Sequence, residues 1–249
     1  MNDLTAEKTY AIFDSAANRK LVQDLKNAGA SVILFPPLET EKIELETAAA
    51  ARLKNLNEFD WLIFADVLAV DYFLEFLEEN SIDAYELDDL RVCAFGEAVA
   101  DRLRFASVHA DIIPAKIETA AVFSAISDYV GQSEIGGLRF LYLTESSEKK
   151  DLADELRVRD AKVSEVSLYR VKPFSTKDSV KLKTLLKGGA IDEFLLTAPT
   201  DLLALKHFFS GENLAAVLAE AKISAADGVM FQAVKEHDLK RVAFFHLDK

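Results

Sequence analysis

The chain carries the same strand and helix pattern twice, and this internal repeat limits the folds open to it more than any other feature. The segment FDWLIFADVLAVDYFLEFL, which begins at Phe59, aligns without gaps on IDEFLLTAPTDLLALKHFF, which begins at Ile191. The alignment pairs Asp60 with Asp192, an offset of 132 residues (192 minus 60). Each segment contains an acidic residue, an apolar run typical of a buried strand, a turn and an amphipathic helix pattern. The repeat predicts a duplicated architecture.

Two further pairs of segments fit nearly the same offset. The first aligns YAIFDSAANRKLVQDLKNAGASV on LYLTESSEKKDLADELRVRDAKV and pairs Leu21 with Leu152, an offset of 131 (152 minus 21). The second aligns RVCAFGEAVADRL on KISAADGVMFQAV at an offset of 131 or 132. The larger offset pairs Gly96 with Gly228, whereas the smaller one gives the better match of apolar positions. The sequence leaves both registers open.

Short apolar runs alternate with amphipathic stretches through most of the chain, as in WLIFA followed by LAVDYFLEFLEEN. Such alternation is typical of parallel sheets covered by helices. Gly29 follows a helix pattern and is predicted to end that helix in the left-handed conformation. We therefore predict an α/β protein with two similar doubly wound parallel-sheet domains. The ligand site is expected between them, in loops at the carboxyl ends of the strands.

Composition excludes several classes of function. Half of the 249 residues are hydrophobic, which indicates a folded core, and the net charge of -13 argues against a nucleic-acid partner or an anionic membrane surface. The single cysteine, Cys93, excludes an internal disulfide and lies in an apolar run, where a buried small side chain is expected. We found no signal-peptide pattern and no apolar run long enough to span a membrane. These features predict a cytoplasmic protein and argue against a periplasmic ligand-binding protein.

Four short motifs occur in an order that is typical of one enzyme family. They are FDWLIFADVLAV, then LRVCAFGEAVADRL with an IIP strand end, then VSLYRVKPF, and finally LLTAPTDL. They are similar, in turn, to the family segments YDWLIFTSANAV, VAAVGEKTAEAL, a VYRT-like strand and an FTSPSAV-like turn. On these motifs the chain resembles uroporphyrinogen-III synthases over most of its length.

The resemblance implies a fold of two doubly wound α/β domains joined by a two-stranded linker. Domain 1 would combine residues 1–36 with residues 174–249, and domain 2 would span residues 37–168. The linker strands would lie near residues 36–38 and 169–173.

The activity implied by the resemblance is the closure of the linear tetrapyrrole hydroxymethylbilane into uroporphyrinogen III, with inversion of the last pyrrole ring and loss of water. Such an enzyme is a lyase that needs no cofactor and no metal, and the four histidines show no metal-ligand spacing. We expect a monomer whose partner is the small-molecule linear tetrapyrrole substrate. The protein would fold the substrate, hold its carboxylates and shelter a cationic intermediate.

The resemblance also implies site residues in the second domain. Tyr169 matches a tyrosine that faces the family's cleft, where its hydroxyl could assist departure of the leaving hydroxyl. A tyrosine packed at a domain junction is the alternative reading. Gly96 matches a glycine at a strand-to-helix turn, where backbone N–H groups of the turn, together with Glu97 and Ala98, would bind substrate.

Hydroxyl residues of a later turn are further candidates for substrate binding. Thr197 and Thr200 stand where the family has hydroxyl residues, and we favour Thr200 as the N-cap of the following helix. Other polar positions of the family are occupied differently in this chain, by Ala65, Asp66, Val99 and Ala198. These departures favour a second hypothesis, a synthase-like protein that has lost turnover and binds a small molecule or a protein partner.

Overall fold

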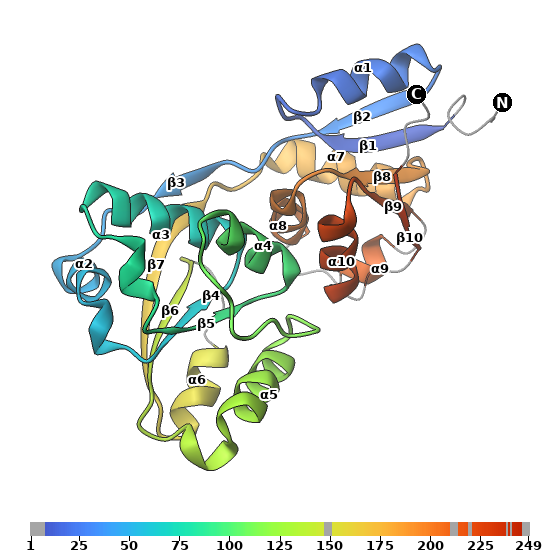
Figure 1. The fold of residues 1–249 in the computed structure, drawn as a ribbon. Coiled ribbons are helices and arrows are strands. Elements are labelled where there is room, and N and C mark those ends of the chain that lie inside the picture. The colour runs from blue at the N-terminus through green and yellow to red at the C-terminus, as the bar shows by residue number, and fades with distance from the viewer. Residues whose placement is uncertain are drawn as a thin grey trace. The chain divides into compact units, whose positions relative to one another are not determined.

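The computed structural model describes residues 8–146, 151–209, 214–218, 221–237, 239 and 241–245. The chain divides into two compact units (Figure 1): unit 1 consists of Met1–Glu39 and Lys172–Lys249, and unit 2 consists of Thr40–Val171. The chain therefore passes between the units twice. The predicted limits of domain 1, domain 2 and the linker strands stay predictions.

Unit 1 is built on a fully parallel sheet with the strand order β10-β9-β8-β1-β2. Its elements are β1 (Thr9–Phe13), α1 (Arg19–Asn27), β2 (Ser31–Phe35), α7 (Thr176–Lys187), β8 (Glu193–Leu196), α8 (Pro199–Phe208), α9 (Leu214–Val217), β9 (Lys222–Ala225), α10 (Gly228–Glu236) and β10 (Val242–Phe244). From β1 the sheet grows to β2 on one side and to β8 on the other. The order of the strands therefore reverses between β1 and β8, which makes this position the topological switch point of unit 1.

Unit 2 repeats this plan with the strand order β3-β7-β6-β4-β5. Its elements are β3 (Thr40–Lys42), α2 (Thr47–Lys54), β4 (Trp61–Phe64), α3 (Val67–Glu79), β5 (Arg91–Ala94), α4 (Glu97–Phe105), α5 (Thr119–Val130), β6 (Arg139–Glu145), α6 (Asp151–Val158), β7 (Lys162–Val171) and three short 3-10 helices. Strands β4 to β7 are parallel, whereas β3 pairs antiparallel with the edge strand β7. The switch point of unit 2 lies between β4 and β6.

The element bounds of the two units settle the register of the repeat. Helix α4 and helix α10 have the same length and are related by an offset of 131, as are β5 and β9. Gly96 is therefore equivalent to Asp227, and the alternative pairing of Gly96 with Gly228 is excluded. Strands β4 and β8 keep the predicted offset of 132. Together with the parallel sheets, this equivalence confirms the predicted fold class of two similar doubly wound units, and Gly29 has the predicted positive φ, at 87°.

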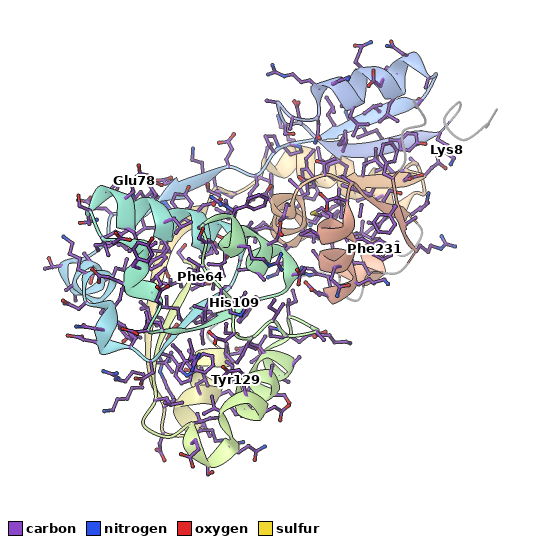
Figure 2. The ribbon with its side chains drawn as sticks, viewed as in Figure 1. Lys8, Phe64, Glu78, His109, Tyr129 and Phe231 are labelled. Carbon is purple, nitrogen blue, oxygen red and sulfur yellow. The ribbon has the colours of Figure 1, made fainter. Side chains whose placement is uncertain are left out.

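The central strands of each sheet, β1 and β8 in unit 1 and β4 and β6 in unit 2, are largely buried. In unit 2, α3 and α4 cover one face, and α5 and α6 cover the other (Figure 1). Phe64, labelled in Figure 2, is fully buried on the first face and contacts Phe73 of α3 at a ring distance of 5.4 Å. Trp61 and Phe140 stack on the second face at 5.9 Å. None of the helices in the described part of the chain combines the length and apolar character needed to cross a membrane.

The acidic residue repeated before each central strand has a structural role. Asp60 accepts a hydrogen bond of 2.8 Å from the backbone N–H of Arg139, and Asp192 accepts one of the same length from Thr9. Each bond ties together two neighbouring strands at the amino end of a sheet. Hydrogen bonds from the Arg139 guanidinium lower the pKa of Asp60. These two aspartates therefore lie at the opposite end of the sheets from the expected ligand loops.

Candidate functional site

The carboxyl ends of the strands at the two switch points are the places where doubly wound sheets bind ligands. In unit 2 this edge carries Ala65, which follows β4, and Thr144, near the end of β6. In unit 1 the corresponding turns begin with Asp14, after β1, and Thr197, after β8.

Three of the helices that start at these edges, α3, α8 and α10, are capped by carboxylates of the protein itself. Four helices, α3, α4, α8 and α10, begin three residues after a strand. Asp66 accepts a hydrogen bond of 2.8 Å from the N–H of Ala69 in α3, and Asp227 accepts one of 2.8 Å from Met230 in α10. A carboxylate in this position stabilises the helix by satisfying an unpaired amide and opposing the helix dipole. It also occupies a place that a ligand carboxylate could otherwise take.

The start of α8 uses a carboxylate from a different position. Asp201 lies in the first turn of α8, and its Oδ2 accepts the N–H groups of Thr197 at 2.7 Å and Ala198 at 3.1 Å, and the Thr197 hydroxyl at 3.1 Å. Burial raises the pKa of Asp201, whereas these hydrogen bonds oppose the shift. The Thr197 hydroxyl donates its hydrogen to Asp201, so its oxygen can still accept a hydrogen bond from another group.

The prediction that Thr200 caps α8 is wrong. The helix begins at Pro199, so its N-cap is Ala198 and Thr200 is already the second helical residue. Proline favours the first helical position because its φ is fixed near the helical value and it has no N–H to satisfy. Asp201 takes over the capping role from inside the helix, as in one half of a capping box.

The start of α4 is formed by a glycine. Gly96 has φ 88° and ψ 173°, a conformation that favours glycine, and as the N-cap residue it has no side chain to cap the helix. Glu97 lies in the first turn, and its carboxylate forms an ion pair with Arg104 of the same helix. Ala98 is partly exposed and brings no polar side chain. Of the four helix starts, α4 is therefore the one whose N-cap residue is a glycine, which brings no side chain to the backbone N–H groups.

Tyr169 lies inside unit 2, on strand β7. Its ring is fully buried and stacks on Tyr72 of α3 at 5.1 Å, with 15° between the ring planes. The Tyr72 hydroxyl is hydrogen-bonded to Thr40 of β3 at 2.8 Å. Tyr169 thus has the packing expected of a structural strand tyrosine, and a substrate would reach its hydroxyl only after a neighbouring group moved.

The structure therefore separates the candidate residues into two groups. Gly96, Glu97, Ala98 and Tyr169 belong to unit 2, whereas Thr197 and Thr200 belong to unit 1. The sequence analysis missed the capping role of Asp201, although its spacing from Ala198 fits half of a capping box.

A cavity of about 510 Å³ opens in unit 1 beside the edge strand β2. Its lining is mainly apolar, with one carboxylate, Asp14, and one ammonium, Lys181. None of the predicted site residues lines it.

No group of three histidine, cysteine or acidic side chains among the described residues is placed to hold a metal ion. Cys93 is fully buried, as predicted, and burial raises the pKa of its thiol to about 12. A thiol with this pKa is protonated at neutral pH and is a poor nucleophile. Neither observation adds a reactive group to the candidate site.

Comparison with known proteins agrees with the sequence motifs. The family model for uroporphyrinogen-III synthase HemD matches residues 19–244. The chain is 24% identical over 220 residues to a uroporphyrinogen-III synthase of Chlorobaculum parvum, covering 88% of this chain and 85% of that protein. It is 21% identical over 225 residues to a porphyrin biosynthesis protein HemD of Ruminiclostridium josui, covering 89% of this chain but 42% of the longer relative.

Solved structures share the fold. A mutant uroporphyrinogen III synthase of Thermus thermophilus superposes with a TM-score of 0.67 at 18% identity, covering 94% of this chain and 92% of that one. A second structure of the Thermus thermophilus protein gives a TM-score of 0.64 at 17% identity with the same coverage. Since the family model spans most of the sequence and the fold agrees, the chain belongs to the uroporphyrinogen-III synthase family.

Proposed function

We propose that this protein is an active uroporphyrinogen-III synthase, which cyclises hydroxymethylbilane to uroporphyrinogen III with inversion of the last pyrrole ring and loss of water. The observation that carries the proposal beyond family membership is the glycine at the start of α4, Gly96, which has a φ of 88° and places no side chain at the helix amides. A substrate rich in carboxylates needs hydrogen-bond donors, and the backbone N–H groups of a helix start supply them without a basic side chain. Such donors would allow a chain with a net charge of -13 to bind an anionic substrate.

The proposed chemistry asks little of reactive side chains. Ring closure is driven by the electron-rich pyrroles of the substrate, so the protein contributes by orienting the chain and stabilising charge. The reaction is a lyase reaction that would proceed without a cofactor, in a cytoplasmic monomer. Tyr169 is retained as the candidate donor to the leaving hydroxyl, which requires that its buried hydroxyl becomes accessible during the reaction.

A second candidate function is supported by the capping aspartates. Asp66 and Asp201 place a carboxylate in the turns next to both switch points, where like charge disfavours a ligand carboxylate. A synthase-like protein that binds a small molecule or a protein partner without turnover would tolerate this arrangement.

A coupled assay separates the two candidates. Hydroxymethylbilane is supplied and the uroporphyrinogen isomers are resolved after oxidation, with and without the protein. The synthase hypothesis predicts that the inverted isomer III dominates. If the product is only the uninverted isomer that forms without protein, the binding function is favoured.

A further inference from the structure

Thr144 stands at the switch point of unit 2. The residue before it, Leu143, pairs with Phe64 of β4, and the Leu143 carbonyl accepts a hydrogen bond of 3.1 Å from the N–H of Ala65. Thr144 and Ala65 are therefore the next positions on two neighbouring parallel strands. Because side chains alternate along a strand, Thr144 shares the sheet face of Tyr142.

The hydroxyl of Thr144 is buried and unsatisfied. The residue is 5% exposed, and its Oγ1 has no hydrogen-bond partner in the described part of the chain. Such a group costs free energy, since it has lost water without gaining a protein partner. Native proteins contain few of these groups, and each calls for an explanation.

The other unit shows the alternative arrangement. At its switch point Thr197 donates its hydroxyl hydrogen to Asp201, so that hydroxyl is satisfied by the protein. In unit 2 the carboxylate of Asp66, in the turn after β4, accepts a hydrogen bond from Ala69 of α3, and Thr144 has no partner among the described residues. The hydroxyl of Thr144 thus keeps its full hydrogen-bonding capacity at the edge where a ligand is expected.

We propose that Thr144 is a substrate-binding residue whose hydroxyl hydrogen-bonds an uncharged polar group of the ligand, such as a pyrrole N–H. It would supply, from β6, the hydroxyl that family resemblance leads one to expect at position 65 on β4. An uncharged group is favoured over a carboxylate because Asp66 brings negative charge to the adjoining turn. The inference rests on the proposed synthase function.

The test is Thr144→Val, which removes the hydroxyl and preserves the shape of the side chain. We expect the KM for hydroxymethylbilane to rise about threefold to tenfold, the loss of one hydrogen bond, with kcat changed less than twofold. The melting temperature of the free protein should stay the same or rise, because a buried unsatisfied group is removed. Thr144→Ser should restore the KM, and Thr144→Ala gives the same readout if the valine variant does not fold.

The matched control is Ser127→Ala in α5. Ser127 is 3% exposed, and its hydroxyl is likewise buried without a hydrogen-bond partner among the described residues. It lies near the end of α5 where Tyr129, labelled in Figure 2, contacts Trp61 at the amino end of β4, so it is remote from the carboxyl edge. Its removal should leave both the KM and kcat unchanged.

An unchanged KM in Thr144→Val, with wild-type isomer III formation, overturns the inference and leaves the synthase function standing. A wild-type protein that forms only the uninverted isomer overturns the synthase function instead. In that case the affinity of each variant for uroporphyrin III, measured by fluorescence, tests the binding role of Thr144. Weaker binding by Thr144→Val than by Ser127→Ala supports this role. Equal affinities, or no detectable binding, refute it.

Discussion

Helices α4 and α10 occupy the same place in the two units, yet they begin in opposite ways. Both are nine residues long and both follow a strand by three residues. The residue before α4 is Gly96, with a φ of 88° and no side chain, whereas the residue before α10 is Asp227, with a φ of -150° and a carboxylate that caps Met230. A carboxylate of the protein caps the start of α10, whereas Gly96 brings no carboxylate to the start of α4.

The comparison shows that the two units share the order and length of these strands and helices but differ in the residues at the helix starts. The carboxylates that close the turns do not even come from equivalent positions, since Asp66 precedes α3 but Asp201 lies within α8. If the start of α4 is the anion site, importing the Asp227 arrangement into it should remove function. The following experiments are ordered by the size of the expected effect.

The substitution Gly96→Asp transfers the closed start of α10 to α4. We expect kcat/KM for hydroxymethylbilane to fall about 100-fold, since the new carboxylate would compete for the helix amides and repel the carboxylates of the substrate. Steady-state kinetics measures the effect. Gly96→Ala strains the same backbone conformation by about 1–3 kcal/mol without adding charge, so it separates strain from repulsion. Equal kinetic losses in both variants would rule out an anion site at α4.

The ends of the same two helices predict a difference in acid stability. The cap after α10 is His237, and the cap after α4 is Ala106. Burial, and then the charge of Lys206, lower the pKa of His237 to about 4. The unfolded state therefore binds the proton more tightly, and stability should be lost as pH falls from about 6.5 towards 4, by up to about 3 kcal/mol. Urea unfolding at several pH values measures this loss, which His237→Gln should reduce; an undiminished loss would assign the acid sensitivity to other groups.

The strands before these helices differ at one buried position. Cys93 of β5 is equivalent to Ser224 of β9, whose hydroxyl is satisfied by the buried carboxylate of Glu193. The position equivalent to Glu193 in unit 2 is Trp61, which offers no such acceptor. Cys93→Ser should therefore destabilise the protein by about 1–3 kcal/mol, as measured by urea unfolding. Cys93→Ala removes the sulfur without adding a hydroxyl, and it should be more stable than the serine variant; the reverse order would show that the serine finds a partner.

The capping bonds of the two aspartates should contribute similarly to stability. Asp66→Ala and Asp227→Ala each remove the side-chain hydrogen bond that caps a helix amide, and the loss of such a cap costs about 1 kcal/mol in the free energy of unfolding. Thermal and urea unfolding of both variants measure the cost. A much larger loss of unfolding free energy in Asp66→Ala would indicate that the Asp66 carboxylate also stabilises parts of unit 2 outside α3.

The sequence predicted the architecture well because the repeat and the apolar runs are properties of many residues at once. An error at one position, such as the open choice between Gly228 and Asp227 as the partner of Gly96, does not change the pattern of strands and helices. The parallel sheets, the two units and the burial of Cys93 all follow from such patterns.

The turns were less predictable because a few hydrogen bonds decide each of them. Thr200 looked like a cap, but Pro199 sets the first helical position and Asp201 binds the loop amides. The unsatisfied hydroxyl of Thr144 could not be read from sequence either. It depends on which side chains the fold brings within hydrogen-bond distance of Thr144, and a residue pattern does not specify such distances.

The double passage of the chain between the units has a consequence for protein synthesis. Unit 2 is continuous, so all its residues have been made once Val171 is added. The first strand of unit 1, β1, needs β8 as a neighbour, and Glu193 is the first residue of that strand. During translation, the N-terminal β1-α1-β2 segment is therefore made before its partner strand β8. One edge of β1 stays unpaired while all of unit 2 is synthesised. Chaperones that recognise nascent chains should engage this early segment.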